Sequence, residues 1–523
     1  MSLAKSATKI GKLSTIYLVG SITPQVINML VLPIYTDYLS KEQMGVVNLA
    51  ARLSVPLAIV IQLGALAGFK SWFFRTDPPL RPQFVRTMQL SQLGINAAVV
   101  GILALTGLVA SQWILPGLPY SATAVYVLWL LILADAFGDA STKLATMVMR
   151  LMEHAKQSVT LNFAWYILQT TVSLSVVFML ARRGLDEWQG FGRQASSTVA
   201  ALITAVAAAA IVWRYGGGRY DPHMARQTLR TGVTFVPHQL SDGLMLTANA
   251  WMVNGLFSTA ALGVYGIAIS FAQIIQLAIF NFSDAAYPTL SNLMRQGGAE
   301  SRRKQARIYT LTLLILIVVL LGQQLFATVG IRVLTNPAFH EAAAIVPILI
   351  LAWTFQAFYM IVVQPVFFFG GGFWLSCATF ASIVVSIGLG AWTIPEFGIY
   401  GAAWSVVAGF VSRFVVAVSA STYLYPLPWE ITKLARALAC AALIVWIDGT
   451  FVDGWLVVVK DLGRPGGFFE RVEWINLVVM SSVKLLLLAS MVPLLWGVGA
   501  VTSRELKMFA DAVRGKLKAT FGR

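Results

Sequence analysis

Two short stretches of this chain repeat one pattern, and the fold can be worked out from them: Leu39-Ser40-Lys41-Glu42-Gln43-Met44-Gly45-Val46-Val47 and Phe257-Ser258-Thr259-Ala260-Ala261-Leu262-Gly263-Val264-Tyr265. Three pairs of residues align without a gap, namely Ser40 with Ser258, Gly45 with Gly263, and Val46 with Val264. Each stretch connects one long apolar segment to the next. An internal duplication in a chain of such segments is typical of many secondary transporters.

The composition indicates which solvent surrounds the chain. Hydrophobic residues make up 58% of the 523 residues and charged residues only 11%, whereas a typical soluble domain has about 25% charged residues. A soluble domain of this length could not bury so much apolar material, so we expect a bilayer around it. The net charge of +16 does not indicate nucleic-acid binding, because the basic residues lie in the connections between apolar segments and form no aromatic-interleaved patch.

Apolar stretches of about 20 residues predict roughly fourteen membrane-spanning helices. Basic connections, at residues 1–12, 70–86, 214–230, 295–307 and 504–523, alternate with neutral or acidic ones. By the positive-inside rule the basic connections and both termini are cytoplasmic, which requires an even number of spans. The first apolar segment lacks an evident cleavage site, so we expect it to be retained. The expected spans are residues 13–36, 45–69, 88–114, 121–149, 157–181, 195–214, 229–256, 261–283, 307–332, 343–369, 373–394, 399–422, 431–451 and 474–500.

The two copies lie six spans apart, so both halves of the chain enter the membrane in the same orientation. We therefore predict an all-α integral membrane protein built from two parallel six-helix lobes and two C-terminal helices. The expected parts are an N-lobe with spans 1–6 at 1–213, a cytoplasmic linker at 214–230, a C-lobe with spans 7–12 at 231–423, spans 13–14 at 424–503, and a basic cytoplasmic tail at 504–523.

Motifs for catalysis, metals or nucleotides are missing from the sequence. Cys377 and Cys440 lie inside apolar segments, where neither a disulfide framework nor a metal site is expected. There is no P-loop or nucleophile elbow, and His340-Glu341 lacks the second histidine of a zinc-protease motif. We therefore expect no catalytic residue, no metal and no cofactor, and we expect energy from an ion, potential or substrate gradient.

Short motifs in both halves resemble one known family. They are Leu32-Pro33-Ile34-Tyr35-Thr36-Asp37-Tyr38-Leu39-Ser40 followed by Gly45, and then Gly232, Pro237-His238, Leu240-Ser241, Gly263-Val264-Tyr265 and Tyr287-Pro288. They look like the bacterial Wzx-type polysaccharide flippases of the multidrug/oligosaccharidyl-lipid/polysaccharide exporter superfamily. The resemblance covers nearly the whole chain and implies a fourteen-helix, two-lobed protein. It also implies transport of an undecaprenyl-diphosphate-linked oligosaccharide from the inner to the outer leaflet. Relatives often carry an Asp-Arg pair where this chain has Asn249-Ala250, so the role of that pair is not carried over.

Span 4 carries a stripe of polar and charged side chains. At 100° per residue the stripe is about 100° wide. Charged groups at mid-bilayer cost on the order of 2.5–3.5 kcal/mol each and usually face an interior cavity. The stripe therefore predicts either a ladder of ion pairs that fastens helices together or the polar wall of a cavity. Asp139 precedes Lys143 by one helical turn, which is the order that favours an ion pair. The members of the stripe are Asp135, Asp139, Thr142, Lys143, Thr146 and Arg150.

Arg52 in span 2 and Arg413 in span 12 stand among apolar neighbours. A guanidinium keeps its proton, so it needs an anion or a water-filled cavity, and its planar fork matches phosphate oxygens. We predict that Arg52, Lys143 and Arg413 contact the diphosphate. The alternative for Arg52 is an ion pair with an acid on another helix, such as Asp135. Lys484 in span 14 either contacts the cargo, snorkels, or pairs with Asp448.

Candidates for ion coupling are Asp135 and Asp139, or His238 and Asp242. The latter two lie one turn apart just after Pro237, which frees a backbone carbonyl. They form either a proton relay or a pair that satisfies a kinked helix. Several aromatic residues either stack on sugar faces or belong to the interfacial belt: Trp165, Trp251, Tyr265, Trp353 and Tyr359.

We therefore expect a flippase, not an enzyme, in the bacterial inner membrane, working by alternating access in the synthesis of O-antigen, capsule or exopolysaccharide. Expected partners are the lipid-linked oligosaccharide, membrane lipids, and a polysaccharide polymerase with its chain-length machinery. One alternative is a multidrug or cation antiporter of the same superfamily, but lone intramembrane Arg and Lys favour an anionic cargo. The other is a membrane-embedded polymerase, which would need catalytic groups that the longest outer loop, 452–473, does not offer.

Overall fold

The computed structural model describes residues 23–152, 154–276, 279, 290–452, 472–503 and 505, without the side chains of residues 155, 238, 241 and 242. Regular structure in these ranges is helical. The chain divides into two compact units, the first formed by Met1–Ala268, Leu334–Ile345 and Thr379–Gly409, the second by Ile269–Val333, Val346–Ala378 and Phe410–Arg523. These boundaries are not those of the sequence repeat, and the division into two repeat lobes stays a prediction.

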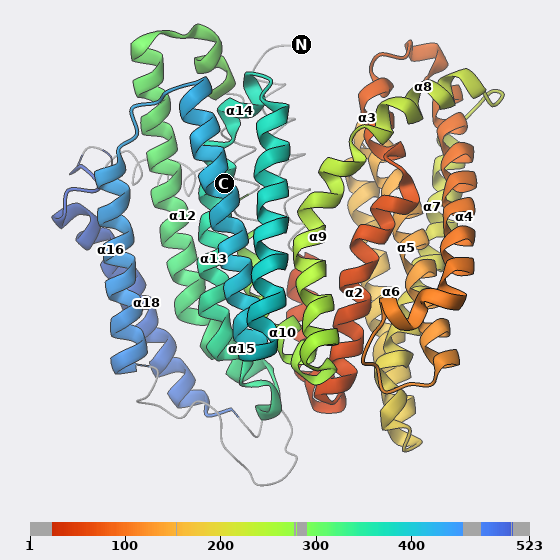
Figure 1. Ribbon diagram of the computed structural model, residues 1–523, viewed down its shortest axis with the longest axis horizontal. Helices are drawn as coiled ribbons and strands as arrows, with labels where there is room; N and C mark the ends of the chain where they lie inside the picture. The colour runs from red at the N-terminus through yellow and green to blue at the C-terminus, as the bar shows by residue number, and fades with distance from the viewer. Residues whose placement is uncertain are drawn as a thin grey trace, which may run out of the picture. The chain divides into compact units, whose positions relative to one another are not determined.

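The first unit contains a bundle that follows a helix at 23–38. In it α5 packs against α2, α4 and α7, and α6 packs against α7 (Figure 1). Further along the chain, α8 packs against α3 and α9 packs against α2. The bounds are α2 Lys41–Gln62, α3 Ala65–Phe73, η1 Pro78–Leu80, α4 Arg81–Ile114, α5 Ala122–Leu151, α6 Ala155–Arg182, η2 Asp186–Trp188, α7 Gln189–Tyr215, α8 Pro222–Val233, α9 Val236–Met252, η3 Val253–Phe257 and α10 Thr259–Ala272.

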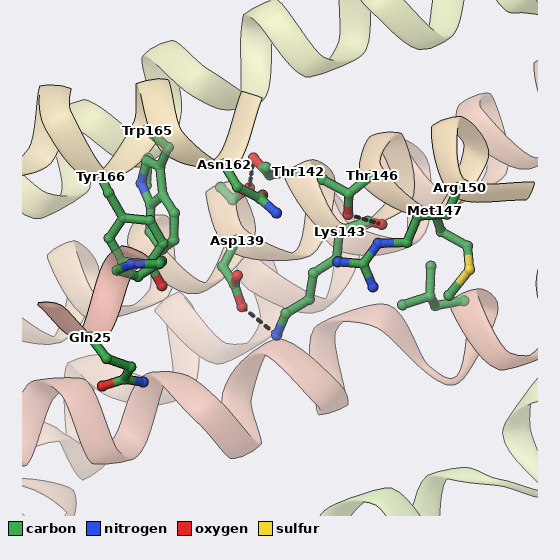
Figure 2. Close-up of a pocket in the computed structure, with 14 residues that line it drawn as sticks. Gln25, Asp139, Thr142, Lys143, Thr146, Met147, Arg150, Asn162, Trp165 and Tyr166 are labelled. Atoms are coloured by element: carbon green, nitrogen blue, oxygen red, sulfur yellow. Dashed lines mark hydrogen bonds and ion pairs between the residues drawn. The ribbon is translucent and has the colours of Figure 1, made fainter. Parts of the chain in front are cut away.

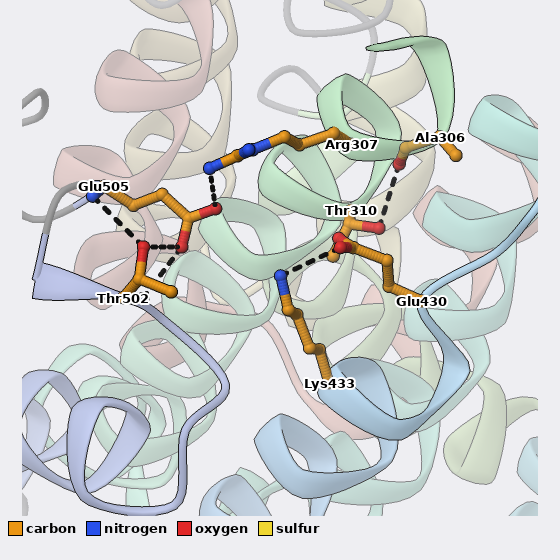
Figure 3. Close-up of polar contacts among 7 residues, drawn as sticks. All are labelled: Ala306, Arg307, Thr310, Glu430, Lys433, Thr502 and Glu505. Atoms are coloured by element: carbon orange, nitrogen blue, oxygen red, sulfur yellow. Dashed lines mark hydrogen bonds and ion pairs between the residues drawn. The ribbon is translucent and has the colours of Figure 1, made fainter. Parts of the chain in front are cut away.

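Most of the later helices belong to the second unit, where an apolar core cluster joins α12, α16 and α18. Near the end of the described chain, the buried Glu505 accepts a hydrogen bond from Arg307 of α12 at 3.0 Å, and Lys433 pairs with Glu430 at 2.9 Å (Figure 3). The bounds are α12 Gly298–Leu334, η4 Pro337–Phe339, α13 Ala342–Val362, α14 Gln364–Phe368, α15 Gly372–Leu424, α16 Ile431–Ile447, η5 Asp448–Val452 and α18 Trp474–Gly497.

The two copies of the repeated stretch begin helices that cross each other. Ser40 caps α2 by accepting from the backbone N–H of Gln43 at 3.2 Å, and Ser258 accepts from Ala261 at 3.1 Å. At the crossing, a Cβ atom on Gly45 would overlap the carbonyl oxygen of Thr259.

The crossing is symmetric in the repeat. A Cβ atom on Gly263 would overlap the carbonyl oxygen of Lys41, which is the residue equivalent to Thr259. Each copy therefore supplies one glycine and one carbonyl, so that two backbones come into direct contact. The duplicated sequence is matched by a duplicated contact.

Eleven helices in the described ranges are long and apolar enough to cross a membrane. Three of the predicted spans are not counted separately among them. The first is described only from residue 23, and span 7 is interrupted. The predicted spans 373–394 and 399–422 are merged in α15, whose 53 residues would measure about 80 Å as one helix. Gly398 breaks it with a φ of 56°, and Thr393 Oγ1 donates to the carbonyl of Gly401 at 3.0 Å. The span total of roughly fourteen stays a prediction.

The expectation of one continuous span at 229–256 is wrong. α8 ends at Val233 and α9 begins at Val236, so Pro237 lies in the first turn of a helix and does not kink one. Proline is favoured there because the first N–H groups of a helix have no partner within it. α8 also extends back into the predicted linker at 214–230.

Candidate functional site

A cavity of about 340 Å³ lies within the first unit, between α5, α6, α3, α7 and the helix at 23–38. Five of the six residues of the predicted span 4 stripe line it. Figure 2 shows their side chains along one side of α5. The stripe thus lines a cavity, as one alternative predicted, whereas its ion pair between Asp139 and Lys143 joins two residues of α5 and does not fasten α5 to another helix. The five are Asp139, Thr142, Lys143, Thr146 and Arg150.

The local sequence explains why α5 presents this face. Thr142 donates to the carbonyl of Gly138 at 2.9 Å and Thr146 to that of Lys143 at 3.0 Å, so their hydroxyls are satisfied within the helix. On α5, a Cβ atom on Gly138 would lie 2.8 Å from Ala201, so the glycine lets α7 come close. The charged groups are left to face the cavity.

The charges of the cavity are one carboxylate and two cations among its described lining residues. Lys143 Nζ lies 2.7 Å from Asp139 Oδ2, with side chains 45% and 29% exposed. Arg150 lies seven residues after Lys143 on the same face, about 10 Å further along the helix axis. Cations therefore outnumber carboxylates among the described lining residues, which suits an anion.

The opposite wall comes from α6, where Asn162, Trp165 and Tyr166 share one face at spacings of three and four residues. The rings of Trp165 and Tyr166 have centroids 4.6 Å apart. The buried indole N–H of Trp165 has no hydrogen-bond partner in the described part of the chain. The amides of Asn162 and of Gln25 likewise make no hydrogen bond within the described ranges. Asn162, Tyr166 and Gln25 were not among the sequence-predicted site residues, although Gln25 stands out in the sequence as a polar residue directly after Pro24.

Asp135 lies one turn before Asp139 but does not line the cavity. Its carboxylate accepts from Ser54 of α2 at 3.3 Å and from Ser197 of α7 at 3.0 Å. It makes no ion pair with any residue that the structure describes. The alternative in which Asp135 neutralises Arg52 is therefore not realised.

Arg52 lies on α2 outside the cavity lining. Its backbone carbonyl accepts from Thr247 of α9 at 2.9 Å, and its guanidinium is close enough to Tyr265 of α10 to interact electrostatically. Tyr265 is fully buried, and its hydroxyl has no hydrogen-bond partner among the described residues. Arg52 thus stands where α2, α9 and α10 meet.

The two candidate cations of the second unit have other contacts. Arg413 is 4% exposed, and its guanidinium carbon lies 4.2 Å from the ring centroid of Tyr359, a cation–π contact. Lys484 is fully buried, and its Nζ lies 2.7 and 2.6 Å from the two carboxylate oxygens of Asp448. The alternative in which Lys484 pairs with Asp448 is confirmed.

The remaining coupling candidates lie outside the described side chains, since His238 and Asp242 are placed only as backbone of α9. One further cation, the half-buried Arg193, was missed from the sequence. Arg193 lies in α7, with its guanidinium carbon 3.7 Å from the ring centroid of Tyr35 and its Nη1 3.5 Å from the Sδ of Met44. The expected start of span 6 at residue 195 had left it in a connection.

A family model described as "Polysaccharide biosynthesis protein" matches residues 10–294, more than half of the chain. The chain belongs to the polysaccharide biosynthesis protein family. This membership confirms the resemblance seen in the sequence motifs. A comparison of this family member with curated proteins found no match.

Solved structures share the fold of this polysaccharide biosynthesis protein. The lipid II flippase MurJ in an inward closed conformation is 12% identical, with a TM-score of 0.66, and the match covers 90% of this chain and 97% of that one. An inward-facing multidrug resistance MATE family transporter of the MOP superfamily is 13% identical, with a TM-score of 0.64 and coverage of 76% and 94%. At these identities the likeness establishes the fold, and with it the predicted class of a multi-pass, all-α membrane protein.

Proposed function

We propose that the protein is a flippase that moves a diphosphate-linked lipid oligosaccharide across the bacterial inner membrane, by alternating access, for surface polysaccharide synthesis. Family membership supports a role in polysaccharide synthesis. A fold neighbour named as a lipid II flippase supports a lipid-linked cargo. The observation that carries the proposal is a polar cavity whose described lining holds two cations and one carboxylate, next to helices long and apolar enough to span a membrane.

The physical task explains why such a cavity is needed. A sugar diphosphate has many polar groups, and moving each into hydrocarbon without a partner costs several kcal/mol. A polar cavity replaces their hydration while the isoprenoid tail stays in lipid. In our proposal the ammonium of Lys143 and the guanidinium of Arg150 receive the diphosphate, at the end of the cavity where α5 approaches its C-terminus.

The ion pair in the cavity suggests how binding is coupled to a proton. Asp139 neutralises Lys143 at 2.7 Å, so it competes with a cargo phosphate for the same cation. Protonation of Asp139 releases Lys143 to the phosphate, and deprotonation favours release of the cargo. Asp135, whose partners are neutral hydroxyls, can accept a proton without breaking an ion pair and is the second coupling candidate. His238 and Asp242 stay candidates from sequence alone.

We also keep Arg52, which lies near Tyr265, and Arg413, which lies over the ring of Tyr359, as proposed phosphate contacts at other points of the transport path. The polymerase and chain-length partners, and the cytoplasmic location of both termini, belong to the same proposal. The rival of a cationic-drug antiporter is supported by the fold shared with a multidrug transporter. Two cations against one carboxylate in the cavity favour the anionic cargo.

Cells that lack the native gene test this proposal when they produce the wild type or Lys143→Gln at equal protein levels. We expect Lys143→Gln to lose most surface polysaccharide and to accumulate the lipid-linked precursor. Lys304→Gln is a matched control, because Lys304 forms the same i,i+4 pair with Glu300 at 2.7 Å but is 62% exposed. Normal polysaccharide in Lys143→Gln would contradict the phosphate role. Normal polysaccharide in cells lacking the gene, with increased sensitivity to cationic drugs, would favour the rival.

A further inference from the structure

The cavity has two chemically different ends. Figure 2 shows Trp165, Tyr166 and Gln25 gathered on one side, with Asp139 between them and the cations Lys143 and Arg150. Only the cationic end is used by the proposed phosphate contacts. The aromatic end brings together rings and amides from α6 and the helix at 23–38.

The polar groups of the aromatic end are incompletely satisfied. The Trp165 indole N–H is buried without a partner in the described chain, and such a donor costs about 1–3 kcal/mol when it is left unpaired. The amides of Asn162 and Gln25 each offer donors and an acceptor, and neither makes a hydrogen bond within the described ranges. Two of these groups share one face of α6, and the third, the amide of the exposed Gln25, comes from the helix at 23–38, so two helices direct polar groups to one cavity.

A sugar ring matches this end in shape and chemistry. A pyranose has an apolar C–H face, which can lie on an aromatic ring, and a rim of hydroxyls that donate and accept hydrogen bonds. Trp165 and Tyr166 supply ring surface, and the two amides supply partners for the rim. A diphosphate alone would leave the aromatic surface uncovered.

We propose that Trp165, Asn162 and Gln25 form a subsite that binds a pyranose ring of the cargo, beside the diphosphate held at Lys143. The inference rests on the proposed function and deepens it. At about 340 Å³ the cavity is at the small end of ligand pockets, which hold about 300–1,000 Å³. The cavity therefore accommodates a single sugar ring with its phosphates, and the subsite recognises the sugar nearest the lipid. The rest of the glycan extends beyond the cavity.

Binding to the purified full-length protein in detergent tests the subsite with two probes. One is undecaprenyl diphosphate carrying the oligosaccharide, and the other is undecaprenyl diphosphate without sugar. We expect Trp165→Ala to weaken binding of the glycosylated lipid about tenfold, equivalent to about 1.4 kcal/mol, and to leave the bare lipid within about twofold. Trp165→Phe keeps a ring and should recover most of the loss. Lys143→Gln should weaken both probes.

Two further variants keep the test decisive if Trp165→Ala does not fold. Asn162→Leu and Gln25→Leu keep side-chain size but remove the amide, and we expect the same selective loss. Trp113→Ala is the control, because Trp113 is 81% exposed and does not line the cavity. Unchanged binding of both probes, or equal weakening of both, in the cavity variants overturns the subsite. A wild-type protein that binds neither probe overturns the proposed function itself.

Discussion

The crossing of α2 and α10 predicts the cost of one added methyl group. In Gly45→Ala the new Cβ would overlap the carbonyl oxygen of Thr259, and in Gly263→Ala it would overlap that of Lys41. Both obstacles are backbone atoms, so no side chain can rotate away and the helices must separate. Overpacking of this kind costs about 1–3 kcal/mol. We expect each variant to lose about that much free energy of unfolding.

The double variant is informative because the two glycines act on one contact. Once the first methyl group has separated the helices, the second meets less resistance, so the two losses should sum to more than the double variant loses. Gly94→Ala and Gly101→Ala are matched controls in α4, since an added Cβ at either position meets nothing within 4 Å. Alanine favours a helix over glycine by about 0.8–1.0 kcal/mol, so these controls should be at least as stable as the wild type.

Thermal unfolding of the purified variants in detergent, followed by size-exclusion chromatography of heated samples, measures these differences. The reasoning predicts lower midpoints for Gly45→Ala and Gly263→Ala and no loss for the α4 controls. If all four variants unfold at the wild-type temperature, the backbone contact between the two repeat copies does not exist as described. Fully additive losses in the double variant would also refute a shared contact.

Three other perturbations concern single charged side chains. Lys484→Met removes the cation that lies against the buried carboxylate of Asp448 and should cost about 3–5 kcal/mol in unfolding experiments. Lys484→Met with Asp448→Leu should recover most of this loss, and no recovery would contradict the pair. Burial alone would raise the pKa of Glu505, but hydrogen bonds from Thr502 and the charges of Lys433 and Arg307 outweigh it and hold that pKa below its ordinary value. The stabilisation is therefore complete at neutral pH and lost as pH falls through the lowered pKa, so Glu505→Gln should unfold earlier than the wild type at pH 7, and this difference should shrink as the pH is lowered into the acid range. Arg52→Ala and Arg52→Lys should both reduce surface polysaccharide at equal protein levels, since lysine keeps the charge but not the fork; full export by both would remove Arg52 from the proposed path.

Charged side chains made part of the site predictable from sequence. Charged residues are easily recognised in an apolar segment, and the helical period alone places three of them, Asp139, Lys143 and Arg150, on one face. Asn162 is uncharged and does not stand out in this way, and Trp165 was one of many aromatic residues that fit an interfacial belt equally well. Their grouping depends on which face α6 turns towards α5, and periodicity does not determine that.

In the repeat, the local structure was predictable from sequence but the long-range contact was not. Ser40 and Ser258 were aligned from sequence, and both begin helices as a serine N-cap favours. That the two copies also contact each other could not be foreseen, because it depends on the approach of segments more than 200 residues apart. Pro237 shows the limit within one segment, since the same residue suits a helix start and a mid-helix kink.

Transport by the purified full-length protein in vesicles tests the central claim most directly. Vesicles would contain a fluorescent undecaprenyl-diphosphate oligosaccharide in both leaflets, and a membrane-impermeant quencher would report the fraction that reaches the outer leaflet with time. The account predicts that the wild type and Lys304→Gln exchange the lipid between leaflets, that Lys143→Gln is slower by tenfold or so, and that empty vesicles show no exchange. Wild-type vesicles no faster than empty ones, or Lys143→Gln equal to the wild type, would contradict it.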